Sequence, residues 1–272
     1  MSADQALRQR YRRPDAPTPV GDNATLRTLL DHRSVRAYLP DPLAPGTIET
    51  LIAAAQSAPT SSNLQPWSVV AVQDPVRKAR LAALAGDQKH IVEAPLLLVW
   101  LIDFHRLIQI GAARGTPPAA LDYLESFVLG SVDASLAAQN AVVALESLGL
   151  GAVYIGGIRN RPAEVAAELG LPPRVFALFG LVVGRPDPAR PAAVKPRLPQ
   201  SAVLFHERYS PAEEQGAGTP DYDAALRAFQ REQGLPERDW SDQALERTRG
   251  PESMAGRHVL RDVLHGIGFA LR

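Results

Sequence analysis

The stretch from Ala119 to Leu148 constrains the fold of this chain more than any other, because it contains no proline and follows a helical pattern throughout. Apolar residues occupy nearly all sides of this predicted helix, and small residues such as Ala134, Ala137 and Ala141 recur along it. A helix that is apolar on every face is a buried one. We therefore expect a central helix on which other elements pack and which also contacts a second subunit.

Apolar runs bounded by turn-forming residues predict the strands of a sheet. The runs Trp67–Val72, Leu96–Ile102 and Val175–Val183 are short and continuous, which is typical of buried strands. A fourth strand is predicted in the segment Gly151–Gly157, where it runs into a glycine turn. Because helical patterns precede, separate and follow these strands, we expect a mixed α and β fold in which helices cover the sheet.

Helix-start signals place helices around these strands. Asn23 or Thr25 can cap a first helix that ends near His32. Asp74 followed by Pro75 predicts another helix, because an aspartate cap with proline in the first helical position favours a helix start.

The two ends of the chain differ from its middle. Residues 1–22 are polar and rich in arginine and lack the apolar core of a secretory signal, so we expect a flexible extension there. The segment 201–272 is more polar than the middle, with helices predicted over 221–233 and 257–265 and a loop over 211–220.

Composition limits the classes of function. The 272 residues suffice for one large domain, and 29 basic residues balance 29 acidic ones, which argues against a nucleic-acid partner. The chain has no cysteine, so disulfides, thiolate nucleophiles and cysteine-bound metals are excluded, which fits a reducing, cytoplasmic setting. No run of about 18 apolar residues is found, so we expect no membrane span.

The sequence contains no motif for a phosphate loop, a metal or a catalytic nucleophile. The patterns G-x-G-x-x-G, G-x-x-x-x-G-K-[ST], H-E-x-x-H and G-x-S-x-G are absent, and no two of the six histidines have metal-ligand spacing on a helix. We therefore assign no catalytic side chain and no metal. If the chain is an enzyme, a bound cofactor carries its chemistry.

Two cationic clusters are the strongest candidates for a binding site. His32–Arg36 reads His-Arg-Ser-Val-Arg, and Lys195–Pro199 reads Lys-Pro-Arg-Leu-Pro and holds one of only three lysines. Guanidinium, ammonium and hydroxyl donors together suit a dianionic phosphate. Each cluster alone also has a structural explanation, since an arginine at a helix C-terminus offsets the helix dipole and a Lys-Pro-Arg loop is often a solvated turn.

A glycine pair, Gly156-Gly157, follows the fourth predicted strand. Backbone without side chains can approach a flat ring closely and direct N–H groups at its heteroatoms. An ordinary tight turn explains the pair equally well.

Five motifs together carry more information than any one of them. In chain order they are His32–Arg36, the serine-rich loop that ends in Leu64-Gln65-Pro66-Trp67, Gly86–His90, Tyr154–Asn160 and Lys195–Pro199. In their order and spacing the chain resembles the FMN-dependent nitroreductase family, in its branch of oxygen-insensitive NADPH nitroreductases and flavin reductases. The resemblance runs from about residue 25 to the C-terminus.

This resemblance implies an α+β, nitroreductase-like fold, with a mixed, mostly antiparallel central sheet wrapped by helices and a helical C-terminal excursion. It implies a single FMN-binding domain over residues 23–272, in which 200–272 covers the active site and the partner subunit. Members of the family are homodimers, and FMN lies at the subunit interface in contact with both chains.

The resemblance also implies which residues contact FMN. The residues that match phosphate and ribityl contacts are His32, Arg33, Ser34, Arg36, Lys195 and Arg197. Polar flavin contacts are matched by Thr60 and Gln88, and the backbone along the flavin ring is matched by Tyr154, Ile155, Gly156 and Gly157.

For the reductant, the branch uses a basic loop before a Trp-Ser-Asp motif, found here at 240–242, to recognise the 2′-phosphate of NADPH. The candidates in this chain are Arg231 and Arg238. The stretch 250–255 lacks the basic residues usual in the branch, so NADH is an alternative reductant. Asn63, beside Ser62, stands where a bulky aromatic residue is common, which predicts a wider pocket for the acceptor.

The implied reaction is a ping-pong transfer of two electrons, from NADPH as a hydride to flavin N5 and then to nitroaromatics, quinones or free flavin. Two alternatives stay open. The chain is a flavin reductase that supplies reduced flavin to a partner, or it is a non-enzymatic flavin-binding protein for storage or redox sensing. The second alternative predicts bound flavin that nicotinamides do not reduce.

Overall fold

The computed structural model describes residues 2–13, 16–209 and 218–272. The chain divides into two compact units. We call Ser34–Pro191 with Ala255–Arg272 the sheet unit, and Met1–Arg33 with Ala192–Met254 the helical unit. Most of the loop predicted at 211–220 lies outside the described residues.

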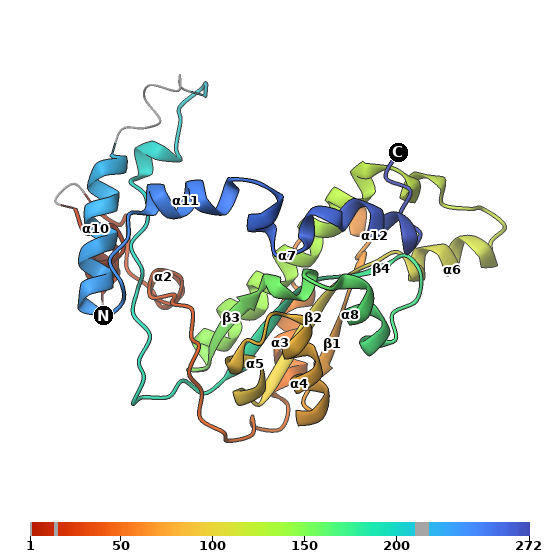
Figure 1. The fold of residues 1–272 in the computed structure, drawn as a ribbon, viewed down its shortest axis with the longest axis horizontal. Coiled ribbons are helices and arrows are strands. Elements are labelled where there is room, and N and C mark those ends of the chain that lie inside the picture. Colours follow the sequence, from red (N-terminus) through yellow and green to blue (C-terminus); the bar gives the residue numbers. More distant parts are fainter. Residues whose placement is uncertain (1, 14–15, 210–217) are drawn as a thin grey trace. The chain divides into compact units, whose positions relative to one another are not determined.

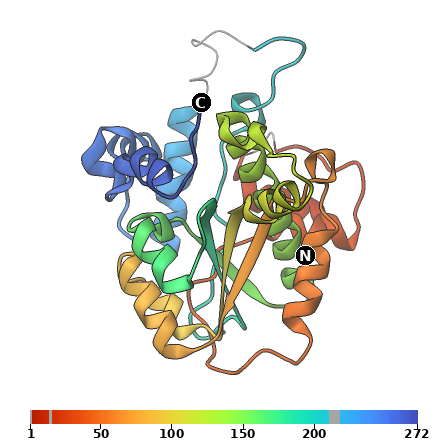
Figure 2. The ribbon, with the colours of Figure 1, turned by 90° about the vertical axis from the view of Figure 1, so that its right-hand side faces the viewer.

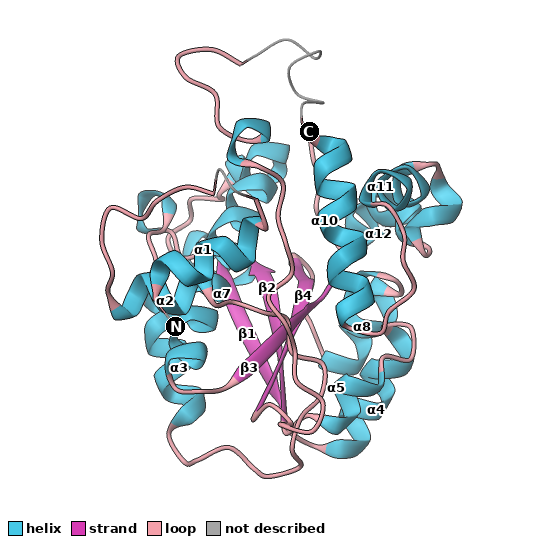
Figure 3. Ribbon diagram, turned by 90° about the vertical axis from the view of Figure 1, so that its left-hand side faces the viewer, coloured by secondary structure: helices cyan, strands magenta, loops and turns pink. Residues whose placement is uncertain are grey.

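The sheet unit is built on four antiparallel strands in the order β1-β2-β4-β3 (Figure 3). The strands are β1 (Trp67–Val72), β2 (Leu96–Asp103), β3 (Gly151–Ile155) and β4 (Val175–Gly184). All four predicted strands are confirmed. Parallel pairing is found, among the described residues, only at the isolated bridge between Ser34 and Ala152.

Helices cover both faces of this sheet (Figure 2). On one face lie α3 (Thr47–Gln56) and α7 (Leu124–Ser147), and on the other lie α4 (Pro75–Leu84), α5 (Lys89–Glu93) and α8 (Pro162–Leu169). Beneath α7, the alternate β2 residues Leu98 and Trp100 are fully buried, together with Leu145 of the helix. Because side chains alternate along a strand, Leu98 and Trp100 point to the same face, and the residues between them are buried on the other face.

The predicted central helix is confirmed, but it begins later than expected. Residues Ala119–Asp122 form a separate short 3-10 turn, and Tyr123 is extended with a ψ of 150° before α7 starts. Helix α7 is long and apolar enough, with a mean hydropathy of 1.4, to cross a membrane by length and composition alone. Core helices of soluble proteins pass the same test, and the small residues of α7 are buried against the sheet.

The C-terminal residues close one end of the sheet unit. Helix α6 (His105–Ala113) follows β2, and α12 (Leu260–Gly266) lies near the end of the chain (Figure 1). Phe269 is fully buried, and its ring lies 5.4 Å from that of Phe104 and 5.5 Å from that of Phe127. This aromatic cluster anchors the last residues to the sheet unit.

The helical unit contains α1 (Ala3–Tyr11), α2 (Ala24–Leu30), α10 (Thr219–Glu232) and α11 (Trp240–Thr248). Asn23 caps α2 as predicted, with its side chain accepting a hydrogen bond from the N–H of Leu26. The flexible extension expected for residues 1–22 is not what the structure shows at 3–11. Helix α1 starts at a capping box between Ser2 and Gln5 and packs its buried side against α2.

The predicted C-terminal excursion is shared between the two units. Residues 192–254 belong to the helical unit, whereas 255–272 belong to the sheet unit. The remaining short 3-10 turns are Ser61–Asn63, Gly156–Arg159, Gln200–Ala202, Pro251–Met254 and Arg257–Val259.

Candidate functional site

The glycine turn after β3 is the most closely packed part of the candidate site. A Cβ atom on Gly157 would lie 2.3 Å from the carbonyl oxygen of Ala85 and 2.6 Å from Nε2 of Gln88. Only glycine fits at that distance. The packing brings Gln88, a predicted flavin contact, directly against the predicted ring-binding backbone.

Two guanidinium groups flank the same turn. A Cβ atom on Gly156 would lie 3.5 Å from Nη2 of Arg159 and 3.5 Å from Nη1 of Arg257. Burial, and then the charge of Arg257, lower the pKa of Arg159, whose Nη1 donates to the carbonyl of Leu178. Two guanidinium groups therefore lie close to the turn. The sequence reasoning assigned neither arginine a role, although Arg159 stands inside one of the five motifs.

The segment Ser34–Arg36 runs beside the start of β3. Ser34 bridges Ala152, and the N–H of Val35 donates to the Ala152 carbonyl at 2.9 Å. Burial and the nearby charge of Arg36 lower the pKa of His90, two residues after Gln88. Gln88 is the residue that precedes the first turn of α5.

Orphaned polar atoms mark this region as suited to a polar ligand. Nε2 of His90 and Oδ1 of Asn160 are buried, and neither has a hydrogen-bond partner in the described part of the chain. Buried polar groups in folded proteins are almost always paired. The chemistry of these groups, a ring nitrogen and an amide oxygen near the glycine turn, is compatible with the donors and acceptors of a flavin ring.

The ring of Tyr154 lies on β3 next to the turn. It meets Phe179 edge-on at 5.2 Å, and its hydroxyl donates to Oε1 of Gln139 at 3.4 Å. Burial raises the pKa of Tyr154, so its hydroxyl stays protonated at neutral pH.

The loop from Thr60 to Gln65 is held by a buried carboxylate on α7. Asp133 is only 2% exposed and accepts hydrogen bonds from the Thr60 hydroxyl at 2.5 Å and from the Ser61 N–H at 3.3 Å. The Thr60 hydroxyl in turn accepts from the N–H of Gln65 at 3.0 Å. The sequence reasoning missed Asp133, which stood out only as an acid in an otherwise apolar helix.

The same loop carries the two residues expected near the electron acceptor. Ser62 and Asn63 are exposed and have φ values of 48° and 55°, and Gln65 has a φ of 50°. Side chains other than glycine rarely adopt this left-handed conformation. Asp133 thus anchors the start of a loop in which Ser62 and Asn63 adopt this conformation.

In the helical unit, Arg10 joins the two predicted phosphate-binding segments. Its guanidinium donates to the carbonyls of His32 at 2.6 Å and of Lys195 at 2.9 Å. The N–H of Arg197 donates to the carbonyl of Arg10 at 2.9 Å. Segments more than 160 residues apart in the chain therefore meet at one buried side chain.

The structure divides the predicted phosphate ligands between its units. His32, Arg33, Lys195 and Arg197 belong to the helical unit, and Ser34 and Arg36 to the sheet unit. That all six residues contact one phosphate group remains a prediction. Arg33 also forms an ion pair with Asp31 at 2.6 Å.

The two arginines predicted to recognise the NADPH 2′-phosphate are each engaged by a glutamate. Arg231 forms two hydrogen bonds to Glu237, at 2.9 and 2.7 Å, and Arg238 contacts Glu246 at 2.5 Å. These pairs lower the pKa of both glutamates, so they are ionised at neutral pH. To bind the 2′-phosphate of NADPH, Arg231 and Arg238 would have to release these glutamates.

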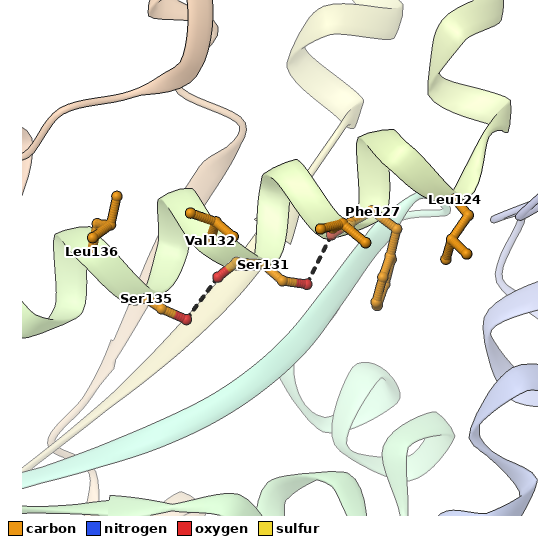
Figure 4. A pocket seen from close by; sticks show the side chains of 7 residues that line it. Leu124, Phe127, Ser131, Val132, Ser135 and Leu136 are labelled. Atoms are coloured by element: carbon orange, nitrogen blue, oxygen red, sulfur yellow. Dashed lines mark hydrogen bonds between the residues drawn. The ribbon is translucent and has the colours of Figure 1, made fainter. Parts of the chain in front are cut away.

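The outer face of α7 is apolar and exposed (Figure 4). Leu124, Val128, Val132 and Leu136 follow one another at helical spacing and are 41–52% exposed. With Phe127, Ser131 and Ser135 they line a shallow depression. Both serine hydroxyls donate to the backbone of their own helix, so they add little polarity to this face.

No group of three or more metal-ligating side chains is found within residues 2–13, 16–209 and 218–272.

Comparison with known proteins identifies the family of most of the chain. Residues 29–185 match the model of the nitroreductase family, and residues 195–272 match the C-terminal domain of that family. The chain is 39% identical to an FMN reductase (NADPH) of Bacillus subtilis over 82% of this chain and 90% of that protein. It is 38% identical to an oxygen-insensitive NADPH nitroreductase of Salmonella typhimurium over 91% and 99%.

Solved structures agree with these sequence relatives. An NADPH:FMN oxidoreductase from Vibrio harveyi, complexed with NAD+, superposes with a TM-score of 0.80 at 34% identity. The match covers 92% of this chain and all of that one.

Proposed function

The chain belongs to the nitroreductase family, and on that premise we propose that it is an FMN-dependent oxidoreductase that takes electrons from NADPH. We propose nitroaromatics, quinones and free flavin as its acceptors. When bound, FMN supplies two-electron chemistry by accepting a hydride and passing electrons on. The single observation that carries the proposal is the glycine turn, with Gln88 packed against it and two guanidinium groups beside it.

This chain's own residues bind and orient the flavin. The turn Gly156-Gly157 would present backbone to the ring, and Arg159 and Arg257 would stabilise negative charge on a bound flavin. Side-chain catalysis is not required, because hydride transfer needs only the flavin and a positioned nicotinamide.

The decisive experiment is an anaerobic visible spectrum of the purified protein, recorded before and after NADPH and, in a separate sample, NADH. Rapid bleaching of the flavin band by NADPH supports the proposal. A band that neither nicotinamide bleaches would favour a storage or sensor role. If no flavin is retained even after FMN is added, the proposal fails.

A second experiment tests the phosphate ligands. Each charge-assisted contact is worth about 1.5–3 kcal/mol, so Arg36→Ala and Lys195→Ala should each lose FMN on dialysis. Arg114→Ala, at an exposed arginine after α6, is the control and should retain it. Full flavin occupancy in both site variants would contradict this assignment.

For the reductant, the engaged state of Arg231 and Arg238 predicts only a modest preference for NADPH over NADH. Glu237→Gln releases Arg231 from its partner and should strengthen that preference, because a phosphate would no longer compete with a carboxylate. The measurement is the ratio of kcat/KM for the two nicotinamides. An unchanged ratio would exclude Arg231 as a 2′-phosphate ligand.

We further propose that the protein is a cytoplasmic homodimer with FMN at the subunit interface, and that the apolar face of α7 is part of that interface. A second copy is the occupant that the predicted central helix and this exposed stripe support. Val132→Glu should shift the molecular mass measured by light scattering toward the monomer. Val76→Glu, at an equally exposed valine on α4, should not.

A flavin reductase that supplies a partner is a second candidate, because relatives of this chain bear the name FMN reductase. Turnover with free FMN, compared with turnover with a quinone, separates the two roles.

A further inference from the structure

A buried arginine outside the matched family regions sits where the predicted phosphate-binding segments meet. The family models match residues 29–185 and 195–272, and helix α1 precedes both. Arg10, in the last turn of α1, is only 8% exposed. A charged side chain is rarely buried unless strong hydrogen bonds compensate it.

Three hydrogen bonds of Arg10 go to backbone carbonyls. Nη1 of Arg10 donates to Lys195 at 2.9 Å, and Nη2 donates to Leu30 at 3.0 Å and to His32 at 2.6 Å. The planar guanidinium offers donors in fixed directions, so it sets the spacing of the segments that it joins. One side chain thereby fixes the ends of both cationic clusters.

Helix α1 is itself fixed to the rest of the helical unit. Arg12 forms an ion pair with Glu232 of α10 at 2.7 Å, and its guanidinium lies 5.3 Å from the centre of the Phe229 ring. The hydroxyl of Tyr222, also on α10, donates to the Pro196 carbonyl at 3.1 Å. The helix and the Lys195–Arg197 segment are therefore attached to the same support.

We propose that Arg10 is a positioning residue for the phosphate of FMN: through backbone carbonyls it holds the His32–Arg33 and Lys195–Arg197 segments at the distance that phosphate binding requires. The inference rests on the proposed function. It assigns the N-terminal helix a role in cofactor affinity.

The test is titration of the full-length apoprotein with FMN and with riboflavin, which lacks the phosphate, followed by flavin fluorescence. Arg10→Met should weaken FMN binding about 10- to 100-fold, the range typical when a supporting residue behind a ligand-binding group is lost. Riboflavin binding should change little. Arg8→Met, at an exposed arginine of the same helix, is the matched control and should leave both affinities unchanged.

The outcomes separate this inference from the proposed function. If the unmodified protein binds no FMN, the proposed function fails. If it binds FMN and Arg10→Met binds equally well, or loses riboflavin to the same extent, the positioning role is overturned.

Arg10→Lys is measured alongside, with circular dichroism to verify folding, in case Arg10→Met does not fold. A lysine keeps the charge but lacks the planar fork, so FMN binding should remain several-fold weaker than in the unmodified protein. Full recovery of FMN affinity in this variant would show that charge alone acts and would overturn the inference.

Discussion

The sheet unit buries Leu98, Trp100 and Leu181 completely, whereas the helical unit buries Arg10 and Asp223 beside a smaller apolar core. In the first, strands exclude water from long apolar side chains, and burial is the main source of stability. In the second, distant segments meet through charged hydrogen bonds to backbone and side chains. The predicted FMN ligands therefore belong to two units that are stabilised differently, the sheet unit by apolar burial and the helical unit by charged hydrogen bonds.

One structural feature is nevertheless common to both units. Asp133 of α7 accepts from the Thr60 hydroxyl and the Ser61 N–H, and Asp223 of α10 accepts from the hydroxyl and N–H of Ser241, at 2.7 and 3.0 Å. In each case a buried carboxylate on a helix holds a distant polar segment. The surroundings differ, since Asp133 lies among apolar residues and Asp223 lies in the more polar unit.

The largest effect is expected in the apolar core. Trp100→Ala should lower the free energy of unfolding by about 3–5 kcal/mol, because the site loses a large ring from a fully packed layer. Urea denaturation measures the change. Trp100→Phe should cost much less, since the indole nitrogen has no hydrogen-bond partner among the described residues. A loss below about 1 kcal/mol for the alanine variant would show that this core is loosely packed.

A smaller effect is expected at the first buried aspartate. Asp133→Ala should cost about 1.5–3 kcal/mol, since hydrogen bonds to a charged group are lost and the Thr60 hydroxyl is left without its acceptor. Thr60→Ala combined with Asp133→Ala gives the coupling between them by a double-mutant cycle. Additive effects would mean that the short contact contributes nothing.

The matching change in the helical unit should cost less. Asp223→Ala is expected to lower the free energy of unfolding by about 1–2 kcal/mol, because Asp223 is 7% exposed and Asp133 only 2%, so that water replaces more of the lost contact. The same denaturation experiment applies. If Asp223→Ala proves more damaging than Asp133→Ala, the contrast between the two units is wrong.

The smallest effect is expected at an exposed ion pair and depends on pH. Arg12 lowers the pKa of Glu232 below its ordinary value of 4.5, so the pair stabilises the folded protein fully above that pH. The stabilisation is lost as pH falls through the lowered folded value. Glu232→Gln should therefore have a lower melting temperature than the unmodified protein at pH 7, and the difference should shrink as the pH falls below the lowered pKa of Glu232.

Glu207→Gln, at another exposed glutamate of the helical unit, is the control for this experiment. A difference between the Glu232→Gln variant and the unmodified protein that does not change as the pH falls would show that the charge of Glu232 has no part in it.

The sheet and its covering helices were predictable because their signals are local. A continuous apolar run predicts β2. The adjacent residues Asp74 and Pro75 predict the start of α4 from a stretch of no more than four residues. Helix α1 was missed for the opposite reason. Its sequence is polar, and its burial depends on contacts that Arg10 makes with Lys195, 185 residues away.

In the candidate site too, features with a local sequence signal were predicted and features that depend on contacts between distant residues were not. The glycine turn and Gln88 were predicted from motifs, and the structure brings them together. Nothing local reveals that Arg231 and Arg238 are paired, since their glutamates lie six and eight residues away and in part outside one helix. Asp133 was not predicted either. An acidic residue in an apolar helix indicates that it has a buried hydrogen-bond partner, but the sequence does not identify that partner.

The left-handed residues of the 60–65 loop bear on how this protein can change. Ser62, Asn63 and Gln65 each adopt a backbone conformation that costs a non-glycine residue about 1–2 kcal/mol. Glycine at these positions removes that cost, and the greater freedom of glycine in the unfolded chain offsets part of the gain. The same substitutions would loosen the loop whose residues Ser62 and Asn63 we predict to lie near the electron acceptor. Selection for thermal stability and selection for a new acceptor would therefore act on the same loop.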